Sequence, residues 1–176
     1  VFDKTGTLTK GEFEVNELLT ADGVSEAELL EAAAYAENFS DHPIAASIKR
    51  AFAKEGNEIA AERISDVKEV AGHGIRILLD GAEVFAGNEK LLSDNSIAAV
   101  PTEKPGTVVY VAKSGSYMGC VIISDTIKPE ARQAIKSLKQ AGVKQTVMLT
   151  GDRKKRGSRC KGTWNRYGLY PAFTGR

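Results

Sequence analysis

The start of the chain contains a motif suited to phosphoryl transfer. The heptapeptide DKTGTLT occupies residues 3–9, directly after an apolar pair that predicts a short buried strand. An aspartate at the carboxyl end of a strand, as Asp3 would be, can attack phosphorus and form an aspartyl-phosphate. Gly6 permits a sharp turn close to a phosphate group. Thr7, the loop amides and Lys4 can hold or neutralise its oxygens. The motif therefore predicts a nucleophilic aspartate in a phosphate-binding loop.

This heptapeptide resembles the phosphorylation motif of the P-type ATPases, whose catalytic domain has a haloacid-dehalogenase-like fold. The resemblance extends from residue 1 to about residue 155. It implies that ATP phosphorylates Asp3 with the help of Mg²⁺, and that Asp3 and the main-chain carbonyl of Thr5 are metal ligands. It also implies that the parent protein is an enzyme in which ATP hydrolysis is coupled to cation transport.

Thr5 separates two enzymatic interpretations. Related haloacid-dehalogenase-type phosphatases carry a second aspartate at this position, where it acts as the general acid–base that discharges the phosphoenzyme. Threonine takes up no proton near neutral pH, so the intermediate should persist long enough to drive a conformational cycle. This favours a pump, with such a phosphatase as the alternative. A further alternative is an ATP-binding module that is inactive in this chain, because the family's later Mg²⁺-binding Asp and phosphate-site Lys have no counterpart before residue 176.

A second phosphate-site motif is expected at Thr150, Gly151 and Asp152, which follow an apolar segment. The threonine hydroxyl and the glycine amide can bind phosphoryl oxygens, with the aspartate beside them. Alone, such a tripeptide is more often a turn, but its pairing with an N-terminal aspartate and its resemblance to the family's motif favour a site. Asp125 and Lys128-Pro129 resemble the stretch before the family's next helix, and a helix N-cap region explains them equally well.

Six residues resemble the nucleotide-binding positions of heavy-metal pumps. His42 matches the His-Pro motif whose imidazole packs against adenine, and Glu37 matches the adenine-contacting acid. Gly72 and Gly74 resemble a Gly-x-Gly pattern that lets the backbone approach the phosphates, and a weaker pair completes the set: Gly87 and Asn88. Separately these would be a helix cap and loop glycines, whereas together they indicate an ATP site.

The elements expected around these motifs indicate an α/β fold. Helices are predicted from Ser25, with Glu28 completing a capping box, and from Pro43. Two hairpins are predicted at Asp80-Gly81 and Ser114-Gly115, followed by a helix over Pro129–Gly142 and a strand over Gln145–Leu149. We therefore expect an incomplete, Rossmannoid haloacid-dehalogenase-like phosphorylation domain (1–13 and 121–155) with an inserted α+β nucleotide-binding domain (14–120).

Composition agrees with a soluble segment, and the resemblance implies that this segment lies on the cytoplasmic face of a membrane protein. Of 176 residues, 42% are hydrophobic, which is enough for a core, and no apolar run approaches the length of a membrane span. The two cysteines, Cys120 and Cys160, are isolated and fit neither a disulfide scaffold nor a zinc site. The resemblance implies an integral membrane parent whose other domains, actuator and membrane helices, bind the transported metal outside this segment. Arg153 after the second motif is more typical of zinc, cadmium and lead pumps than of copper pumps.

The last residues differ in charge from the rest. Eight of the 24 Lys and Arg residues lie in 153–176, which has no acidic residue, so 1–152 hold 16 basic and 23 acidic side chains. Nucleic-acid binding is an alternative for such a tail, but no recognised motif places its aromatic residues. Permitted codons for 156–176, read one base later, encode VEAAAKELGIDTVYTQLLPA, which resembles the family's continuation. We therefore expect a frameshifted, disordered tail without a partner; genomic DNA lacking a one-base shift near codon 156 would contradict this.

Overall fold

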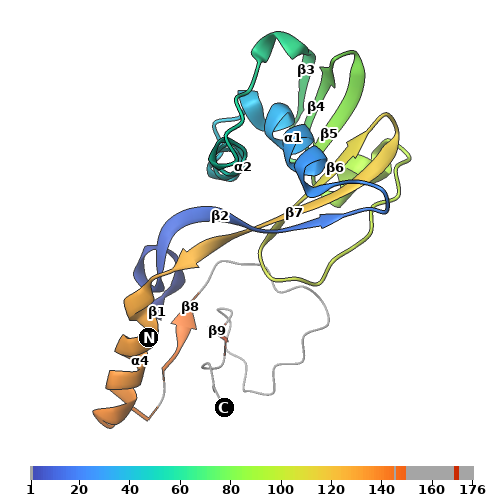
Figure 1. Cartoon of the computed structure of the whole chain (residues 1–176). Coiled ribbons are helices and arrows are strands. Elements are labelled where there is room, and N and C mark those ends of the chain that lie inside the picture. The colour runs from blue at the N-terminus through green and yellow to red at the C-terminus, as the bar shows by residue number, and fades with distance from the viewer. Residues whose placement is uncertain (1, 145, 150–168, 171–176) are drawn as a thin grey trace. The chain divides into compact units, whose positions relative to one another are not determined.

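The computed structural model describes residues 2–144, 146–149 and 169–170 (Figure 1). The chain forms two compact units, one of residues 1–12 and 125–176 and the other of residues 13–124. The sequence predicts boundaries at 13/14 and 120/121. In the structure they lie at 12/13 and 124/125. Among the described helices, none is long and apolar enough to cross a bilayer.

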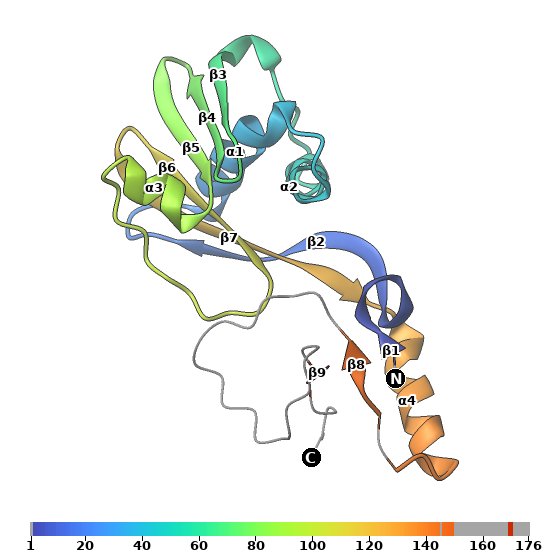
Figure 2. The same cartoon turned by 180° about the vertical axis from the view of Figure 1, so that it is seen from behind.

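The first unit contains a small parallel pair of strands. Strand β1 (Phe2–Asp3) pairs in parallel with β8 (Met148–Leu149), so that Asp3 lies opposite Leu149, and the Phe2 amide donates to the Val147 carbonyl at 2.7 Å. Helix α4 (Pro129–Gln140) lies between these strands in sequence (Figure 2). Parallel strands joined through a helix confirm the α/β class expected from the sequence.

Helix α4 and β8 are shorter than the elements predicted for them. The helix ends two residues early, with Ala141 as its C-cap, and its apolar face is formed by buried Ala131 and half-buried Ile135 and Leu138. The strand comprises two of the five residues expected, of which Gln145 lies outside the described residues. Within the 156–176 tail the structure describes only β9 (Leu169–Tyr170), which pairs antiparallel with β8; the remainder lies outside the described residues.

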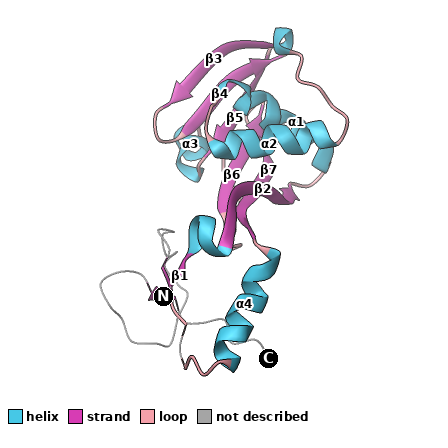
Figure 3. Cartoon of the chain, turned by 90° about the vertical axis from the view of Figure 1, so that its left-hand side faces the viewer, coloured by secondary structure: helices cyan, strands magenta, loops and turns pink. Residues whose placement is uncertain are grey.

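The second unit is built on a six-stranded sheet with the order β2-β7-β6-β5-β4-β3 (Figure 3). Neighbouring strands from β3 to β7 pair antiparallel, as expected for the insert. The strands are β2 (Thr9–Thr20), β3 (Ile64–Val70), β4 (Gly74–Leu79), β5 (Ala82–Gly87), β6 (Thr107–Lys113) and β7 (Ser116–Ile127). The helices are α1 (Glu26–Ala36), α2 (Pro43–Lys54) and α3 (Glu89–Asp94).

Local sequence signals set several of these elements. The Ser25 hydroxyl accepts from the Glu28 amide while the Glu28 carboxylate accepts from the Ser25 amide, so the predicted capping box at α1 is confirmed. Both predicted hairpins are also present. Asp80, Gly81, Ser114 and Gly115 all have positive φ, as two-residue hairpin turns of the primed type require.

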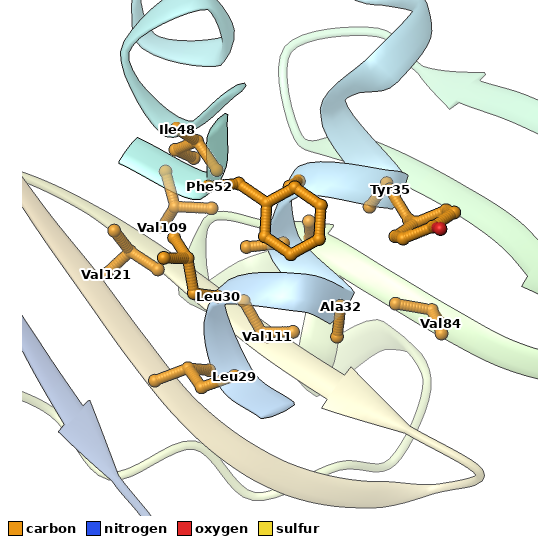
Figure 4. Packing of buried hydrophobic residues seen from close by; sticks show 14 of the residues in the cluster. Leu29, Leu30, Ala32, Tyr35, Ile48, Phe52, Val84, Val109, Val111 and Val121 are labelled. Carbon is orange, nitrogen blue, oxygen red and sulfur yellow. The ribbon is translucent and has the colours of Figure 1, made fainter. Parts of the chain in front are cut away.

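The two faces of the sheet carry different cores. Because side chains alternate along a strand, one face of β6 directs Val109 and Val111 toward α1 and α2, while the other directs Tyr110 and Ala112 toward α3. Figure 4 shows the first of these cores, in which side chains of both helices meet valines of the sheet. Tyr35 and Phe52 pack edge to face there, with ring centroids 6.0 Å apart.

Candidate functional site

The motif at the N-terminus forms an exposed loop at the end of a strand. Asp3 is the last residue of β1 and its side chain is exposed. Residues Lys4–Leu8 form a single π-helical segment, in which Gly6 has a φ of 78°. The parallel register places Asp3 beside Leu149, the residue directly before Thr150. The predicted partners Thr150, Gly151 and Asp152 lie outside the described residues, so their place in the site stays a prediction.

A buried carboxylate holds the far end of this loop. The Thr9 hydroxyl donates to Asp125 Oδ2 at 2.5 Å, and the Gly11 amide donates to Asp125 Oδ1 at 2.9 Å. Thr9 and Asp125 are only 2% and 8% exposed. The Gly6 amide in turn donates to Thr9 Oγ1 at 3.2 Å. Both carboxylate oxygens of Asp125 are therefore used to fix the backbone that follows the expected nucleophile.

Lys128 makes two further hydrogen bonds to the backbone of this loop. Its amide donates to the Leu8 carbonyl at 3.0 Å and its ammonium donates to the Gly6 carbonyl at 2.8 Å. Lys128 is also the N-cap of α4 and Pro129 its first helical residue, which confirms the N-cap interpretation for this pair. Asp125 does not share that role, because it lies three residues earlier and binds the loop. A carboxylate at the end of the apolar run 120–123 was the signal available for it in the sequence.

The donor atoms at this end of β1 suit a hard cation. The Asp3 carboxylate and the Thr5 main-chain carbonyl are oxygen donors, which Mg²⁺ prefers over nitrogen or sulfur. Among the described residues, no group of three or more His, Cys, Asp or Glu side chains comes together that could hold a metal ion. A metal at this loop would therefore take few protein ligands and complete its shell with water and phosphate oxygens, as is usual for Mg²⁺.

In the second unit, the expected adenine contacts lie on the turn between α1 and α2. Glu37 begins a short 3-10 helix, Glu37–Phe39, that directly follows α1. His42 is exposed and caps α2, because its Nδ1 accepts from the Ile44 amide at 3.2 Å. An imidazole that accepts at Nδ1 carries its proton on Nε2 when neutral, so that atom can donate to a ligand.

The carboxyl of Glu37 sits in an unusual electrostatic environment. Burial raises its pKa above the usual range, whereas a hydrogen bond with Ser40 and the nearby ammonium of Lys49 lower it, and Glu69 on β3 raises it. Glu69 acts on this carboxyl as a like charge. Since β3 ends two residues before Gly72, this strand leads directly into the predicted glycine turn.

The four other predicted nucleotide residues form one cluster. Gly74 and Gly87 are paired across β4 and β5, and a Cβ on Gly74 would lie 2.2 Å from the Ala86 carbonyl oxygen. A Cβ on Gly87 would meet the His73 carbonyl oxygen at the same distance. The Asn88 amide donates to that His73 oxygen at 2.8 Å, and its side-chain amide donates to the Gly72 carbonyl at 3.0 Å. Glycine is thus required here by the close approach of two backbones.

A separate hollow lies beside α2 in the second unit. Its volume is about 450 Å³. It is lined by residues of β2, α1 and α2: Phe13, Glu14, Val15, Asn16, Glu17, Leu18, Glu26, Leu30, Ser47, Arg50, Ala51, Lys54 and Glu55. The Arg50 guanidinium donates to the Phe13 carbonyl at 2.7 Å and so covers part of the β2 edge. The predicted nucleotide residues do not contribute to this lining, so we do not assign the nucleotide to it.

Known proteins match most of the chain. A model of the haloacid dehalogenase-like hydrolase family matches residues 1–161. A cadmium, zinc and cobalt-transporting ATPase of Bacillus subtilis (strain 168) is 50% identical over 157 residues, which are 89% of this chain and 22% of that protein. A zinc-transporting ATPase of Synechocystis sp. is 51% identical over 152 residues, which are 86% of this chain and 21% of that protein. The chain thus spans about a fifth of these relatives.

Solved structures agree with the sequence matches. The crystal structure of a zinc-transporting PIB-type ATPase in its E2.Pi state superimposes with a TM-score of 0.71 and 32% identity, over 86% of this chain and 25% of that one. The family model spans residues 1–161 and therefore includes the DKTGTLT segment. The chain therefore belongs to the haloacid dehalogenase-like hydrolase family and, within it, is similar to a segment of the heavy-metal-transporting P-type ATPases.

Proposed function

We propose that this chain is the ATP-binding and phosphorylation region of a heavy-metal-translocating P-type ATPase. The observation that carries the proposal is Asp3, an exposed carboxylate at the carboxyl end of β1, in a chain 50% identical to a metal-transporting ATPase. Thr5 stands where a phosphatase would have its second aspartate, and this favours the pump over the phosphatase alternative. Phosphorylation of Asp3 would then drive a transport cycle.

The chemistry at Asp3 is an in-line phosphoryl transfer. One oxygen of the carboxylate forms a bond to the γ-phosphorus of ATP, and the bond from that phosphorus to the β–γ bridging oxygen breaks, so ADP leaves with the electron pair. The Gly6 region and the Thr7 hydroxyl would hold the phosphoryl oxygens, together with Thr150 and Gly151. Asp3 and the Thr5 carbonyl would hold Mg²⁺ bound with ATP, which would neutralise charge at those oxygens, and Asp152 is expected beside them.

The second unit would supply the nucleotide. Glu37 and His42 would contact adenine, the first by accepting from its exocyclic amino group and the second through its ring and Nε2. Gly72, Gly74, Gly87 and Asn88 would let the backbone come close to the phosphates. The support for this division is that these six residues lie in two local groups of one unit, the turn between α1 and α2 and the paired glycines of β4 and β5.

The transported ion and the remaining partners belong to other parts of the pump. The relatives named above transport cadmium, zinc and cobalt, or zinc alone, so a soft divalent cation is the proposed cargo. Arg153 after the second phosphate motif agrees with a zinc-type pump rather than a copper-type one. We place the cation site in membrane helices outside these residues, and this segment on the cytoplasmic face of the membrane.

Two measurements test the proposal. In the complete pump, label from γ-labelled ATP should appear as an acid-stable, hydroxylamine-labile phosphoprotein, and Asp3→Asn should abolish it. In the 176-residue chain, calorimetry should detect ATP binding that weakens at least several-fold in His42→Asn. Asparagine is a good N-cap, so this variant removes the imidazole while keeping the cap of α2. Label that persists in Asp3→Asn, or equal ATP affinity in His42→Asn, would overturn the corresponding role.

A further inference from the structure

A lysine on α2 holds the turn that carries the expected adenine contacts. The Lys49 ammonium donates to the Asn38 carbonyl at 3.2 Å and to the Ser40 carbonyl at 3.1 Å. These two carbonyls flank Phe39, whose side chain is 55% exposed. Lys49 lies seven residues after His42, two helical turns along α2, and is itself half-buried. It therefore connects the body of α2 to the chain between Glu37 and His42.

The ends of this turn are bound to the two helices: the Glu37 amide donates to α1 carbonyls and His42 caps α2. The turn follows the end of α1, where the last carbonyls of a helix have no partner within the helix. The Ser40 amide closes the 3-10 helix by donating to the Glu37 carbonyl at 3.1 Å, and the Ser40 hydroxyl accepts from the His42 amide at 3.3 Å. Both bonds stay within the turn. The bonds from Lys49 instead tie it to a helix whose own side chains are packed in the core.

We propose that Lys49 is a positioning residue for adenine recognition, which fixes the segment from Glu37 to His42 in its binding conformation before the nucleotide arrives. The inference rests on the proposed ATP-binding role of this segment. Holding a binding loop in advance raises affinity because the nucleotide no longer has to order the loop itself. Lys49 need not touch the nucleotide for this effect.

Lys49 has a second, electrostatic effect on the same segment. Three charged or polar groups face the Glu37 carboxyl: Ser40 on its own turn, Lys49 on α2 and Glu69 on β3. Burial and Glu69 raise the Glu37 pKa, whereas Ser40 and Lys49 lower it. Loss of the ammonium should therefore move the Glu37 pKa further upward. The ionised carboxylate, which accepts from the adenine amino group, would then be less populated at a given pH.

The test compares three variants in the 176-residue chain. Lys49→Met removes the charge and both donors, Lys49→Arg keeps them, and Lys54→Met removes an exposed lysine from the same helix as a control. ATP affinity is measured by calorimetry, and the Glu37 pKa by NMR of its carboxyl carbon in the ligand-free chain. We expect Lys49→Met to weaken ATP binding about fivefold or more, since two charge-assisted hydrogen bonds are lost, and to raise the Glu37 pKa.

Each outcome separates the inference from the proposed function. Recovery of affinity in Lys49→Arg, with Lys54→Met unchanged, would support the positioning role. The direction of the Glu37 pKa shift distinguishes a direct effect of Lys49 from general destabilisation, because loss of the ammonium raises this pKa, whereas unfolding of the turn would expose the carboxyl and lower it. ATP affinity and Glu37 titration unaltered by Lys49→Met, or an equal loss in Lys54→Met, would overturn the inference alone. No ATP binding by the unchanged chain would overturn the proposed function, and this inference with it.

Discussion

The two candidate sites of this chain are held in place by different kinds of contact. The phosphate loop after Asp3 is fixed by Asp125 and Lys128, through hydrogen bonds that join residues 114, 116 and 122 positions apart. The second site has two parts: the turn Glu37–His42, called the adenine turn, and the glycine cluster of Gly72, Gly74, Gly87 and Asn88. Their hydrogen bonds join residues only 2 to 16 positions apart. The first site thus forms only when distant parts of the chain meet, while each group of the second site is held by residues closer in sequence.

The two sites also differ in whether side chains or backbone atoms make the stabilising contacts. At the phosphate loop, charged side chains bind backbone groups and the Thr9 hydroxyl. At the glycine cluster, two backbones touch directly because Gly74 and Gly87 have no side chain. A site held by side chains can be loosened by isosteric substitution, whereas a site held by backbone contact can be changed only by adding atoms. The expected effects of substitution therefore differ in size and in cause.

The largest effect is expected from Gly74→Ala. Its Cβ would lie 2.2 Å from the Ala86 carbonyl oxygen, at a φ of 141°. The backbone has to move, so the free energy of unfolding should fall by about 3 kcal/mol, as for strained or overpacked positions. Gly72→Ala is the matched control, since nothing lies within 4 Å of its Cβ although its φ is 72°; about 1 kcal/mol is expected there. Equal losses in urea denaturation would contradict the backbone-contact account.

Asp125→Asn should have the next largest effect. Asparagine has the shape of aspartate but cannot accept from both the Thr9 hydroxyl and the Gly11 amide. Either the Thr9 hydroxyl or the Gly11 amide would lose its acceptor, so the free energy of unfolding should fall by about 2 kcal/mol. A double-mutant cycle with Thr9→Val measures the interaction itself. If the two losses simply add, the pair does not hold the loop.

A smaller loss is expected when the cap of α2 is removed. His42→Ala leaves the Ile44 amide without its partner and should lower stability by about 1 kcal/mol. His42→Asn should restore most of this stability, because asparagine is a preferred N-cap. Thermal unfolding of both variants separates the structural role of His42 from its proposed contact with adenine. Equal melting temperatures for the two variants would show that the cap contributes little.

The smallest effect is a pH dependence contributed by Glu37. Burial raises the pKa of its carboxyl in the folded chain above the ordinary value of a glutamate. The protonated form is therefore favoured on folding, and this stabilising contribution is complete below the unfolded pKa and is lost as pH rises through the folded pKa. Glu37→Gln has no carboxyl to titrate, so it should not lose this contribution. The free energy of unfolding of the variant, relative to that of the unchanged chain, should therefore increase with pH from 4 upward. A constant difference would mean that the carboxyl titrates normally.

The sequence by itself determined the elements whose signals are local. The capping box of Ser25 and Glu28 needs residues three apart, and the turns at Asp80-Gly81 and Ser114-Gly115 need backbone conformations that those residues adopt readily. The prediction of a phosphorylation loop is likewise local, since it rests on seven consecutive residues, 3–9. Strands β2 and β3 and helix α3 were not predicted. β2 mixes charged with apolar residues, β3 is interrupted by a bulge after Ser65, and α3 has only six residues.

Tertiary structure alone decided which side chains support those motifs. The position of Asp125 beside Thr9 depends on how two segments more than 100 residues apart pack together, and no local pattern encodes that distance. The pairing of Asp3 with Leu149, and of Gly74 with Gly87, depends on strand register, which is set by burial of one sheet face and by partner strands. The contacts of Lys49 likewise arise from the packing of α2, whose apolar face points to the core and leaves this lysine beside the adenine turn.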